Sequence, residues 1–336
     1  SVQGDSVMAH DTVNNKLLYV FGDMENSQYG YARVVTISGA TVTLGAKALF
    51  FNAAGYQGGS VVCIGSDKFF IAYTADVGGY MYGTVASVSG TTVTFGTQIV
   101  INSAQTYLSK QGLAYSSTTD AIAMIAHYSS VNYLWRFTVS GTTITNDTSA
   151  KVTLTSVLND GGGSATTSHI VHNTTTDELF VAWKKSAGGS AAYGGVIEMA
   201  AGGGGGSFTG GSAVSFTSDL KGMGGVTWDN TNDRYVVVYS VDADDYQYYS
   251  VASTSSGVTT WGTSTAFVSV AGDANFISFD QSVNKVVTTV NPDSAPYPRN
   301  YTTGVVSGTS ATWATPATLT SASSSNFFTL YDSALE

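Results

Sequence analysis

The chain has 336 residues and a net charge of −10; 43% of the residues are hydrophobic and only 11% are charged. This composition provides a folded core and excludes a disordered chain. The negative charge argues against binding to nucleic acid or anionic membranes, because phosphate groups require clustered lysine and arginine. No apolar run is long enough to span a membrane. The single cysteine, Cys63 in the strand-like run SVVCIG, is predicted to be a buried structural thiol.

A turn between two hydrophobic runs occurs six times along the chain, at intervals of 51 to 57 residues. Its copies are Asn15-Lys16, Asp67-Lys68, Asp120-Ala121, Asp177-Glu178, Asp233-Arg234 and Asn284-Lys285. A second turn, Ser-Gly before a threonine-rich run, occurs at Gly39, Gly90, Gly141, Gly257 and Gly308, and a glycine run at 202–206 takes the place of the missing copy. A fixed period of this length indicates a repeat architecture.

Each repeat contains four short runs rich in Val, Ile, Phe, Tyr and Thr, which predict four β-strands. The second copy shows them most clearly, as SVVCI, KFFIAYTA, YMYGTVASV and TTVTFGTQIVI. Four antiparallel strands at this period predict an all-β fold, a β-propeller of six blades in a single domain. The predicted blades are 1–55, 56–105, 106–157, 158–219, 220–271 and 272–321.

Residues 322–336 begin a seventh copy at NFFTLYDS. We expect an extra strand there that pairs with the first blade and closes the ring, because open blades leave edges prone to aggregation. A seven-bladed ring, or a part of a longer array, is the alternative.

The loops between the second and third strands of each repeat are rich in tyrosine and vary in length, whereas the Asp-Lys and Ser-Gly turns on the other face are short and uniform. Variable loops usually carry function. Tyrosine offers contact area and a hydroxyl at low entropic cost, which suits both sugars and protein surfaces. The predicted ligand-binding residues are Tyr29, Tyr31, Tyr80, Tyr82, Tyr133, Trp135, Tyr246 and Tyr297; packing between blades is the alternative role for each.

Three carboxylates, Asp242, Asp244 and Asp245, lie within four residues of one another. Oxygen ligands at this spacing can hold Ca²⁺, although the sequence lacks the glycine and distal glutamate of an EF-hand loop. They are the candidate metal ligands, with a solvated acidic loop as the alternative, and no other cofactor is predicted. His169 and His172 are three residues apart in a strand, so they point to opposite faces and are unsuited to a shared metal.

One segment resembles an enzyme-associated motif. Residues 253–261, STSSGVTTW, resemble the Asp box of sialidase-type propellers, with Ser255 in place of the aspartate. That box is structural. A sialidase-like site also requires three converging arginines, and the four arginines of this chain are predicted on four different blades. No catalytic residue is predicted, although paired carboxylates for glycoside hydrolysis stay an open alternative.

The consensus D-x-x-x-N-K-x-x-V-x-Y, followed by V-S-G-T-T-x-T-F-G-T-x-x-x-I, resembles repeats in tail fibre and tail-tip proteins of marine phages, especially cyanophages. Residues 11–21, 84–101 and 279–290 carry the likeness, which covers nearly the whole chain, and the fourth repeat departs from it through its glycine run. The resemblance implies a module at the distal end of a virion that contacts the host surface, and it supplies no catalytic residue.

From these observations we predict a non-enzymatic adhesin that recognises a cell-surface glycan or protein through its tyrosine-rich face. A location on a virion tail or extracellular surface, and assembly into a trimeric fibre in which avidity offsets weak single sites, belong to the same prediction. Two alternatives stay open: a glycan-degrading, sialidase-like hydrolase, and a structural spacer with an inert loop face.

Overall fold

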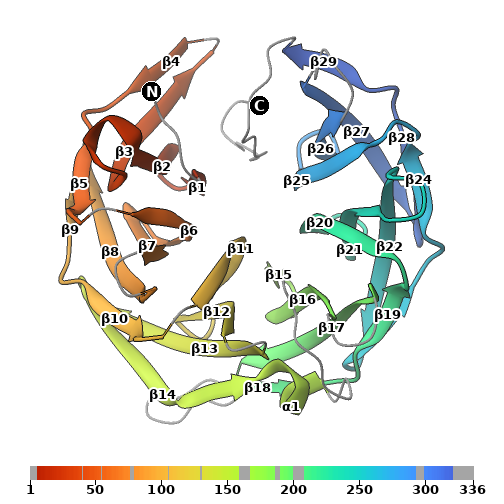
Figure 1. Cartoon of the computed structure of the whole chain (residues 1–336), viewed down its shortest axis with the longest axis horizontal. Helices are drawn as coiled ribbons and strands as arrows, with labels where there is room; N and C mark the ends of the chain where they lie inside the picture. The colour runs from red at the N-terminus through yellow and green to blue at the C-terminus, as the bar shows by residue number, and fades with distance from the viewer. Residues whose placement is uncertain are drawn as a thin grey trace.

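The computed structural model describes residues 6–39, 41–53, 55–75, 79–104, 106–128, 131–158, 167–185, 190–199, 208–292 and 299–320. Their strands form six antiparallel sheets that follow one another around a central axis. Figure 1 shows this ring, with the first strand of each sheet nearest the axis. The predicted six-bladed β-propeller is confirmed.

The first three blades contain strands β1 to β14. Blade 1 comprises β1 (Val7–Asp11), β2 (Lys16–Asp23), β3 (Tyr29–Ser38), β4 (Thr41–Leu44) and β5 (Ala48–Phe51). Blade 2 comprises β6 (Tyr56–Gly65), β7 (Lys68–Ala75), β8 (Met81–Ser89), β9 (Thr92–Phe95) and β10 (Ile99–Asn102). Blade 3 comprises β11 (Thr106–Ser116), β12 (Ala121–Tyr128), β13 (Val131–Ser140) and β14 (Thr143–Thr153).

The remaining blades contain β15 to β29. Blade 4 comprises β15 (Ser168–Asn173), β16 (Glu178–Lys184), β17 (Ala192–Met199), β18 (Phe208–Gly210) and β19 (Val214–Thr217). Blade 5 comprises β20 (Leu220–Asp229), β21 (Arg234–Val241), β22 (Gln247–Ser255), β23 (Val258–Trp261) and β24 (Thr265–Val268). Blade 6 comprises β25 (Gly272–Asp280), β26 (Lys285–Pro292), β27 (Arg299–Ser307), β28 (Ser310–Trp313) and β29 (Ala317–Thr320). Two short helices, η1 (Met24–Asn26) and α1 (Leu154–Leu158), lie in connections.

The predicted outer strand is split in two in every blade except the third, and both halves pair with the same neighbour. In blade 2 the break falls at Gly96, between β9 and β10. A Cβ atom on Gly96 would lie 2.5 Å from the backbone oxygen of Thr142, in the outer hairpin of blade 3. Only glycine allows so close an approach, so the glycine of the T-F-G-T run is required by packing between blades.

The core consists of five hydrophobic clusters, and each lies between two consecutive blades. Strand β7 shows why its sequence is a continuous apolar run. Phe69 and Ile71 face blade 1, whereas Phe70 and Ala72 face blade 3. Inner strands are therefore buried on both faces, which explains why the sequence does not alternate between apolar and polar residues.

The described residues contain no such cluster between the sixth and first blades. Val42 and Leu44 on β4 have exposed fractions of 60% and 54%. The closing strand predicted at 322–336 lies outside the described residues.

The repeated turns have the backbone conformation that their residues favour. All six Asn or Asp residues of the first turn, from Asn15 to Asn284, have φ between 47° and 59°. The glycines of the Ser-Gly turns have φ between 55° and 75°. Asn, Asp and Gly adopt this left-handed conformation more readily than other residues. The two repeated turn motifs in the sequence therefore reflect a left-handed backbone conformation at one residue of each turn.

In blades 1, 3 and 4 the residue at the end of the inner strand joins its own turn to the next blade. Asn173 is fully buried, and its Oδ1 accepts hydrogen bonds from the amides of Thr175 and Thr176 at 2.9 and 3.2 Å. Its Nδ2 donates to Asp233 Oδ1 and to the hydroxyl of Tyr235 in blade 5, at 3.1 and 3.0 Å. This one side chain therefore closes the turn of blade 4 and fixes the position of blade 5.

Replacing Asn173 with Ala is expected to lower the free energy of unfolding by about 2 to 3 kcal/mol, because buried partners in two blades lose their hydrogen bonds. Asp280→Ala is the matched control. Asp280 accepts from Ser282 and Val283 in its own turn, so its loss should cost about 1 kcal/mol. Urea denaturation followed by circular dichroism measures both, and equal costs for the two variants would contradict the role of the contact between blades.

Candidate functional site

Polar side chains reach the axis because the inner strand of blade 3 leaves its ladder. In β11, Leu108 pairs with Ala126 and the next pair is Leu113 with Met124. Five steps along β11 therefore oppose two steps along β12, so three residues of β11 are extra. Such bulges bend a strand and redirect its side chains. Here the bulge carries Lys110 and Gln111 into the centre of the ring.

Two further bulges lie on the other side of the axis. The register of β20 shifts between Met223 and Gly225, and that of β25 shifts between Asn275 and Ile277. Phe276, in the second bulge, has φ of 23°, which is uncommon for a residue other than glycine. Strained backbone of this kind is concentrated at functional sites. Three inner strands thus deviate from regular pairing around the same central space.

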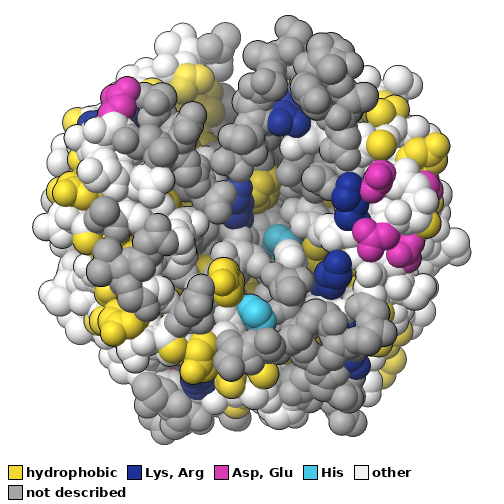
Figure 2. All heavy atoms as spheres, in the orientation of Figure 1, with side chains coloured by type: hydrophobic (Ala, Val, Ile, Leu, Met, Phe, Trp, Pro, Cys, Tyr) yellow, Lys and Arg dark blue, Asp and Glu magenta, His cyan; other side chains and the backbone are white. Residues whose placement is uncertain are grey.

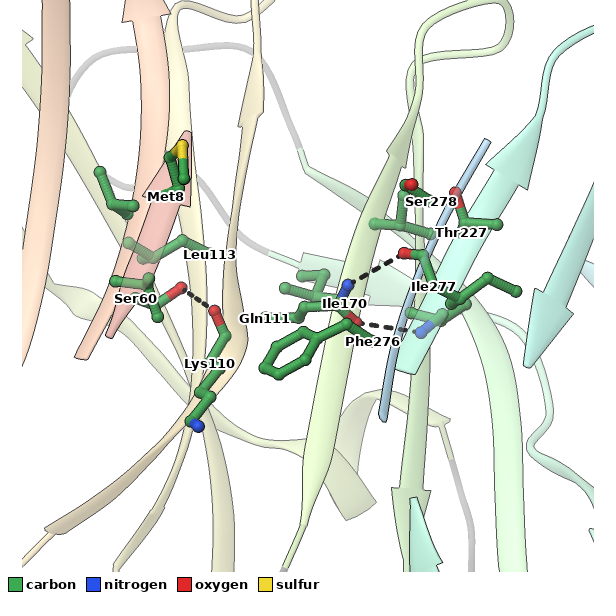
Figure 3. A pocket seen from close by; sticks show the side chains of 14 residues that line it. Met8, Ser60, Lys110, Gln111, Leu113, Ile170, Thr227, Phe276, Ile277 and Ser278 are labelled. Atoms are coloured by element: carbon green, nitrogen blue, oxygen red, sulfur yellow. Dashed lines mark hydrogen bonds between the residues drawn. The ribbon is translucent and has the colours of Figure 1, made fainter. Parts of the chain in front are cut away.

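This space is a cavity of about 220 Å³ on the propeller axis. Ligand pockets for drug-sized molecules span roughly 300 to 1,000 Å³, so the cavity suits a single ring of monosaccharide size. Figure 3 shows its side chains, which come from the innermost strand of all six blades. The lining residues are Val7, Met8, Ser60, Val61, Lys110, Gln111, Leu113, Ile170, Val171, Val226, Thr227, Phe276, Ile277 and Ser278.

Gln111 spans the axis from blade 3. Its Oε1 accepts a hydrogen bond from the amide of Val226 in blade 5 at 3.0 Å. Its Nε2 donates to the carbonyl oxygen of Ile277 in blade 6 at 3.4 Å, as the dashed lines in Figure 3 show. Both backbone groups belong to bulged strands, so Gln111 provides hydrogen-bond partners for backbone groups that lie beside the bulges. The side chain fixes the relative positions of three blades at the cavity.

Lys110 brings a cation into the cavity. Its Nζ lies 5.4 Å from the centroid of the Phe276 ring, and its carbonyl oxygen accepts a hydrogen bond from Ser60 Oγ at 3.0 Å. The side chain is half-buried. Figure 2 shows basic and histidine side chains at the central hollow of this face, whereas most visible acidic side chains lie over blade 5. The described lining residues include no carboxylate.

His169 lies one residue before the cavity-lining Ile170 and has an exposed fraction of 5%. Burial lowers the pKa of His169 to about 4. The imidazole is therefore neutral at physiological pH, in contrast to the ammonium of Lys110. Because His169 is not among the lining residues, it supports the wall of the cavity and does not contact its contents.

Most of the predicted aromatic residues pack inside or against the blades. Tyr82 stacks on Tyr73 at 5.5 Å, Tyr31 lies under Lys47 at 4.9 Å, and Trp135 has an exposed fraction of 2%. Tyr133 packs beside Trp135, whereas Tyr80 is exposed. Tyr29 and Tyr246 are half-buried, and Tyr297 lies outside the described residues. None of the seven described residues lines the axial cavity.

The acidic loop of blade 5 distributes its carboxylates among different partners. Asp245 pairs with Lys221 at 2.8 Å, Asp242 accepts from Ser190 at 3.2 Å, and Asp244 accepts from the Tyr248 hydroxyl at 2.9 Å. In the part of the chain that the structure describes, no three acidic, histidine or cysteine side chains are grouped as metal ligands. The calcium site stays a prediction that these contacts do not support.

Sequence reasoning missed Lys110, Gln111 and the hydroxyl groups of the cavity. One signal was present: SKQG at 109–112 interrupts the inner strand of blade 3 with polar residues, where other inner strands read VVC or VTW. A charged residue within a strand buried on both faces requires a polar destination. The position of this polar site could not be predicted from the sequence, because it also depends on residues from the blades on the opposite side of the ring.

Several solved structures share this fold at low identity. A protein from Lactobacillus plantarum is 13% identical, with a TM-score of 0.64, over 94% of this chain and 85% of its own. A periplasmic gluconolactonase from Pseudomonas aeruginosa is 10% identical, with a TM-score of 0.64, over 95% and 86%. A putative 6-phosphogluconolactonase from Bacteroides uniformis is 12% identical, with a TM-score of 0.59, over 89% and 80%. No protein-family model and no curated protein sequence matches the chain.

These identities show a shared fold, and two of these three structures carry the names of lactonases. The lactonase names contradict our expectation of a non-enzymatic, phage-type adhesin, so that prediction is wrong. The physical reason lies in the aromatic residues: most of the seven described ones pack against blades or a lysine, while polar side chains line the axial cavity. The trimer and the surface location stay predictions. Among the described residues, no helix is long and apolar enough to cross a membrane.

The low pKa of His169 predicts a loss of stability in mild acid. Its unfolded pKa is about 6.5 and its folded pKa is about 4, so the unfolded chain binds the proton first as pH falls. The free energy of unfolding should therefore decrease by about 2 kcal/mol between about pH 7 and pH 5. Urea denaturation across this range should show that decrease in the wild type and a much smaller one in His169→Gln, and parallel curves would contradict the assignment.

Gln111→Leu should expose the amide of Val226 to hydrogen exchange and lower the free energy of unfolding by about 2 kcal/mol, because two backbone groups lose a partner. The amides of the β21–β22 ladder in the same blade should keep their protection. Hydrogen exchange measured by NMR resolves the two positions, and unchanged protection at Val226 would show that the bridge across the axis contributes nothing.

Proposed function

We propose that the chain is a hydrolase of small cyclic esters, of the sugar-lactone class, and that its site is the axial cavity. The single observation that carries the proposal is that Lys110 and the hydroxyl side chains of Ser60, Thr227 and Ser278 line one ring-sized cavity. A cation among neutral donors favours a substrate that develops negative charge on oxygen. The lactonase names among the similar folds support this reaction class.

The chemistry follows from the charge of the cavity. Water attacks the carbonyl carbon of the lactone, and the ring C–O bond breaks to give an open-chain hydroxy acid that releases one proton at neutral pH. In the transition state negative charge develops on the carbonyl oxygen. The ammonium of Lys110 would donate to that oxygen, because a preorganised donor aimed at developing charge is the largest single catalytic contribution in acyl transfer.

The cavity suits ester hydrolysis better than glycoside hydrolysis. Cleavage of a glycosidic bond requires two carboxylates that flank the bond, and the described lining residues include none. The arginines that a sialidase-like site requires are also elsewhere: Arg136 lies 3.9 Å from Asp147, and Arg234 donates to Gly308 of the neighbouring blade. The hydroxyls and the amide of Gln111 instead match the ring hydroxyls of a sugar acid.

The test is proton release from a panel of sugar lactones, measured in a pH-stat against spontaneous hydrolysis. Wild-type protein is expected to accelerate at least one lactone, and Lys110→Met should lower kcat/KM by about 100-fold, the usual loss for one oxyanion donor. Lys285→Met is the matched control, because Lys285 lies at the start of β26 and does not line the cavity.

Two results would contradict the proposal. If the wild-type protein accelerates the hydrolysis of no lactone in the panel, lactone hydrolysis is excluded. A parallel panel of fluorogenic glycosides then tests the glycan-degrading alternative. A Lys110→Met variant as active as the wild type excludes the cavity as the site.

A further inference from the structure

Three aromatic rings surround one ammonium group on blade 3, away from the axial cavity. The Nζ of Lys151 lies 4.5 Å from the ring centroid of Tyr133, 5.2 Å from Trp135 and 5.4 Å from Tyr128. None of these four residues lines the axial cavity. Each distance is within the roughly 6 Å at which a cation is attracted to an aromatic face. We call Tyr128, Tyr133 and Trp135 the aromatic cage.

One ring of the aromatic cage is buried and the other two are partly exposed. Trp135 is buried with an exposed fraction of 2%, whereas Tyr128 and Tyr133 are half-buried. The rings also support one another, with centroids 6.1 Å apart for Tyr128 and Tyr133 and 5.6 Å apart for Tyr133 and Trp135. The β12–β13 ladder holds the backbone of all three cage residues, and Lys151 is not part of that ladder.

Lys151 reaches the cage from an irregular part of its strand. In β14, Asp147 pairs with Arg136 and the next pair is Val152 with Leu134, so five steps along β14 oppose two along β13. Lys151 lies in this interruption and is half-buried. In the other five blades the outer strand is split in two, whereas in blade 3 it is the single strand β14. The lysine can therefore leave the cage without breaking a ladder hydrogen bond.

The chemistry of the cage is that of a site for organic cations. Among the described residues, the other lysines that contact rings meet one ring each: Lys47 meets Tyr31 and also pairs with Asp23, Lys110 meets Phe276 at 5.4 Å, and Lys185 meets Tyr193 at 5.5 Å. Lys151 meets three rings. Burial lowers the pKa of Lys151, which shows that the ammonium gives up hydration to stay there. A quaternary ammonium holds its hydration less tightly and fits such rings better.

We propose that the aromatic cage is a binding site for a small quaternary ammonium ion, and that Lys151 occupies it as an internal ligand until that ion displaces it. The site is independent of lactone hydrolysis, so either proposal can fail without the other.

The test follows Lys151 itself in solution. With lysine isotope-labelled at Cε, the nine lysines of the chain give a simple NMR spectrum, and the three rings should shift the Lys151 signal upfield from the rest. Lys151→Met assigns that signal by its loss. Choline at millimolar concentration is expected to move it to the position of an exposed lysine. The tert-butyl analogue of choline, with carbon in place of nitrogen, has the same shape without charge and should not move it.

Removing the internal ligand should strengthen binding. Lys151→Ala is expected to bind choline about tenfold more tightly by calorimetry, because the competing ammonium is gone. Tyr133→Leu should abolish binding, whereas Tyr193→Leu, which removes the single-ring contact of Lys185, should leave it unchanged. Circular dichroism of each variant verifies folding.

Three results would overturn the proposal. They are a Lys151 signal that choline does not move, a signal that the neutral analogue moves equally, and a folded Lys151→Ala variant that binds choline no better than the wild type. In each case the cage is only a structural clamp for the lysine.

Discussion

The hydrogen bond between the inner-strand end of one blade and the turn of the next is the constraint on which the ring depends. Each sheet of the described residues is one blade, so apolar clusters and polar contacts such as these hold the blades at a fixed angle. Asp11 accepts from the amide of Asp67 at 2.7 Å, Ser116 donates to Asp177 at 2.5 Å, and Asn173 donates to Asp233 at 3.1 Å. Apolar packing has no direction of its own. The polar contact supplies the direction, and the left-handed residue of the turn provides the partner, an amide donor in Asp67 and a carboxylate acceptor in Asp177 and Asp233.

Fixed blades make an irregular centre possible. A bulge leaves backbone groups without ladder partners, and buried groups of this kind must be paired. Gln111 provides for one amide and one carbonyl oxygen across the axis, in strands of blades 5 and 6. The bulge in blade 3 thus places the Gln111 side chain where it pairs with backbone groups beside the bulges in blades 5 and 6. Because the blades are held at the turns, their inner strands can deviate at mid-length, and that deviation forms the cavity.

Local features of the fold could be predicted from sequence, and the site could not. The Asn or Asp at each first turn and the glycine of each Ser-Gly turn encode backbone angles within a few residues, so their period shows the number of blades directly. The cavity instead joins residues that are far apart in sequence: Gln111 and Ile277 meet across 166 positions. The tyrosine-rich loops are ambiguous in sequence for a related reason. Strands buried on both faces need large side chains at their ends, so a tyrosine-rich run indicates packing as readily as recognition.

The aromatic residues have a second role that the low charge of the chain explains. With 23 acidic and 13 basic residues in 336, charged groups are sparse, and several lysines contact aromatic rings. Rings contact Lys47, Lys151 and Lys185, and Phe276 contacts Lys110 at the cavity; Lys47 also pairs with Asp23. At the axis the lysine faces the open space and would meet oxygen atoms of a ligand. On blade 3 the rings face outward, and the group they would meet is a cation. The proposed lactone is neutral and develops negative charge only in the transition state, so the two proposed sites differ in the charge that they would stabilise.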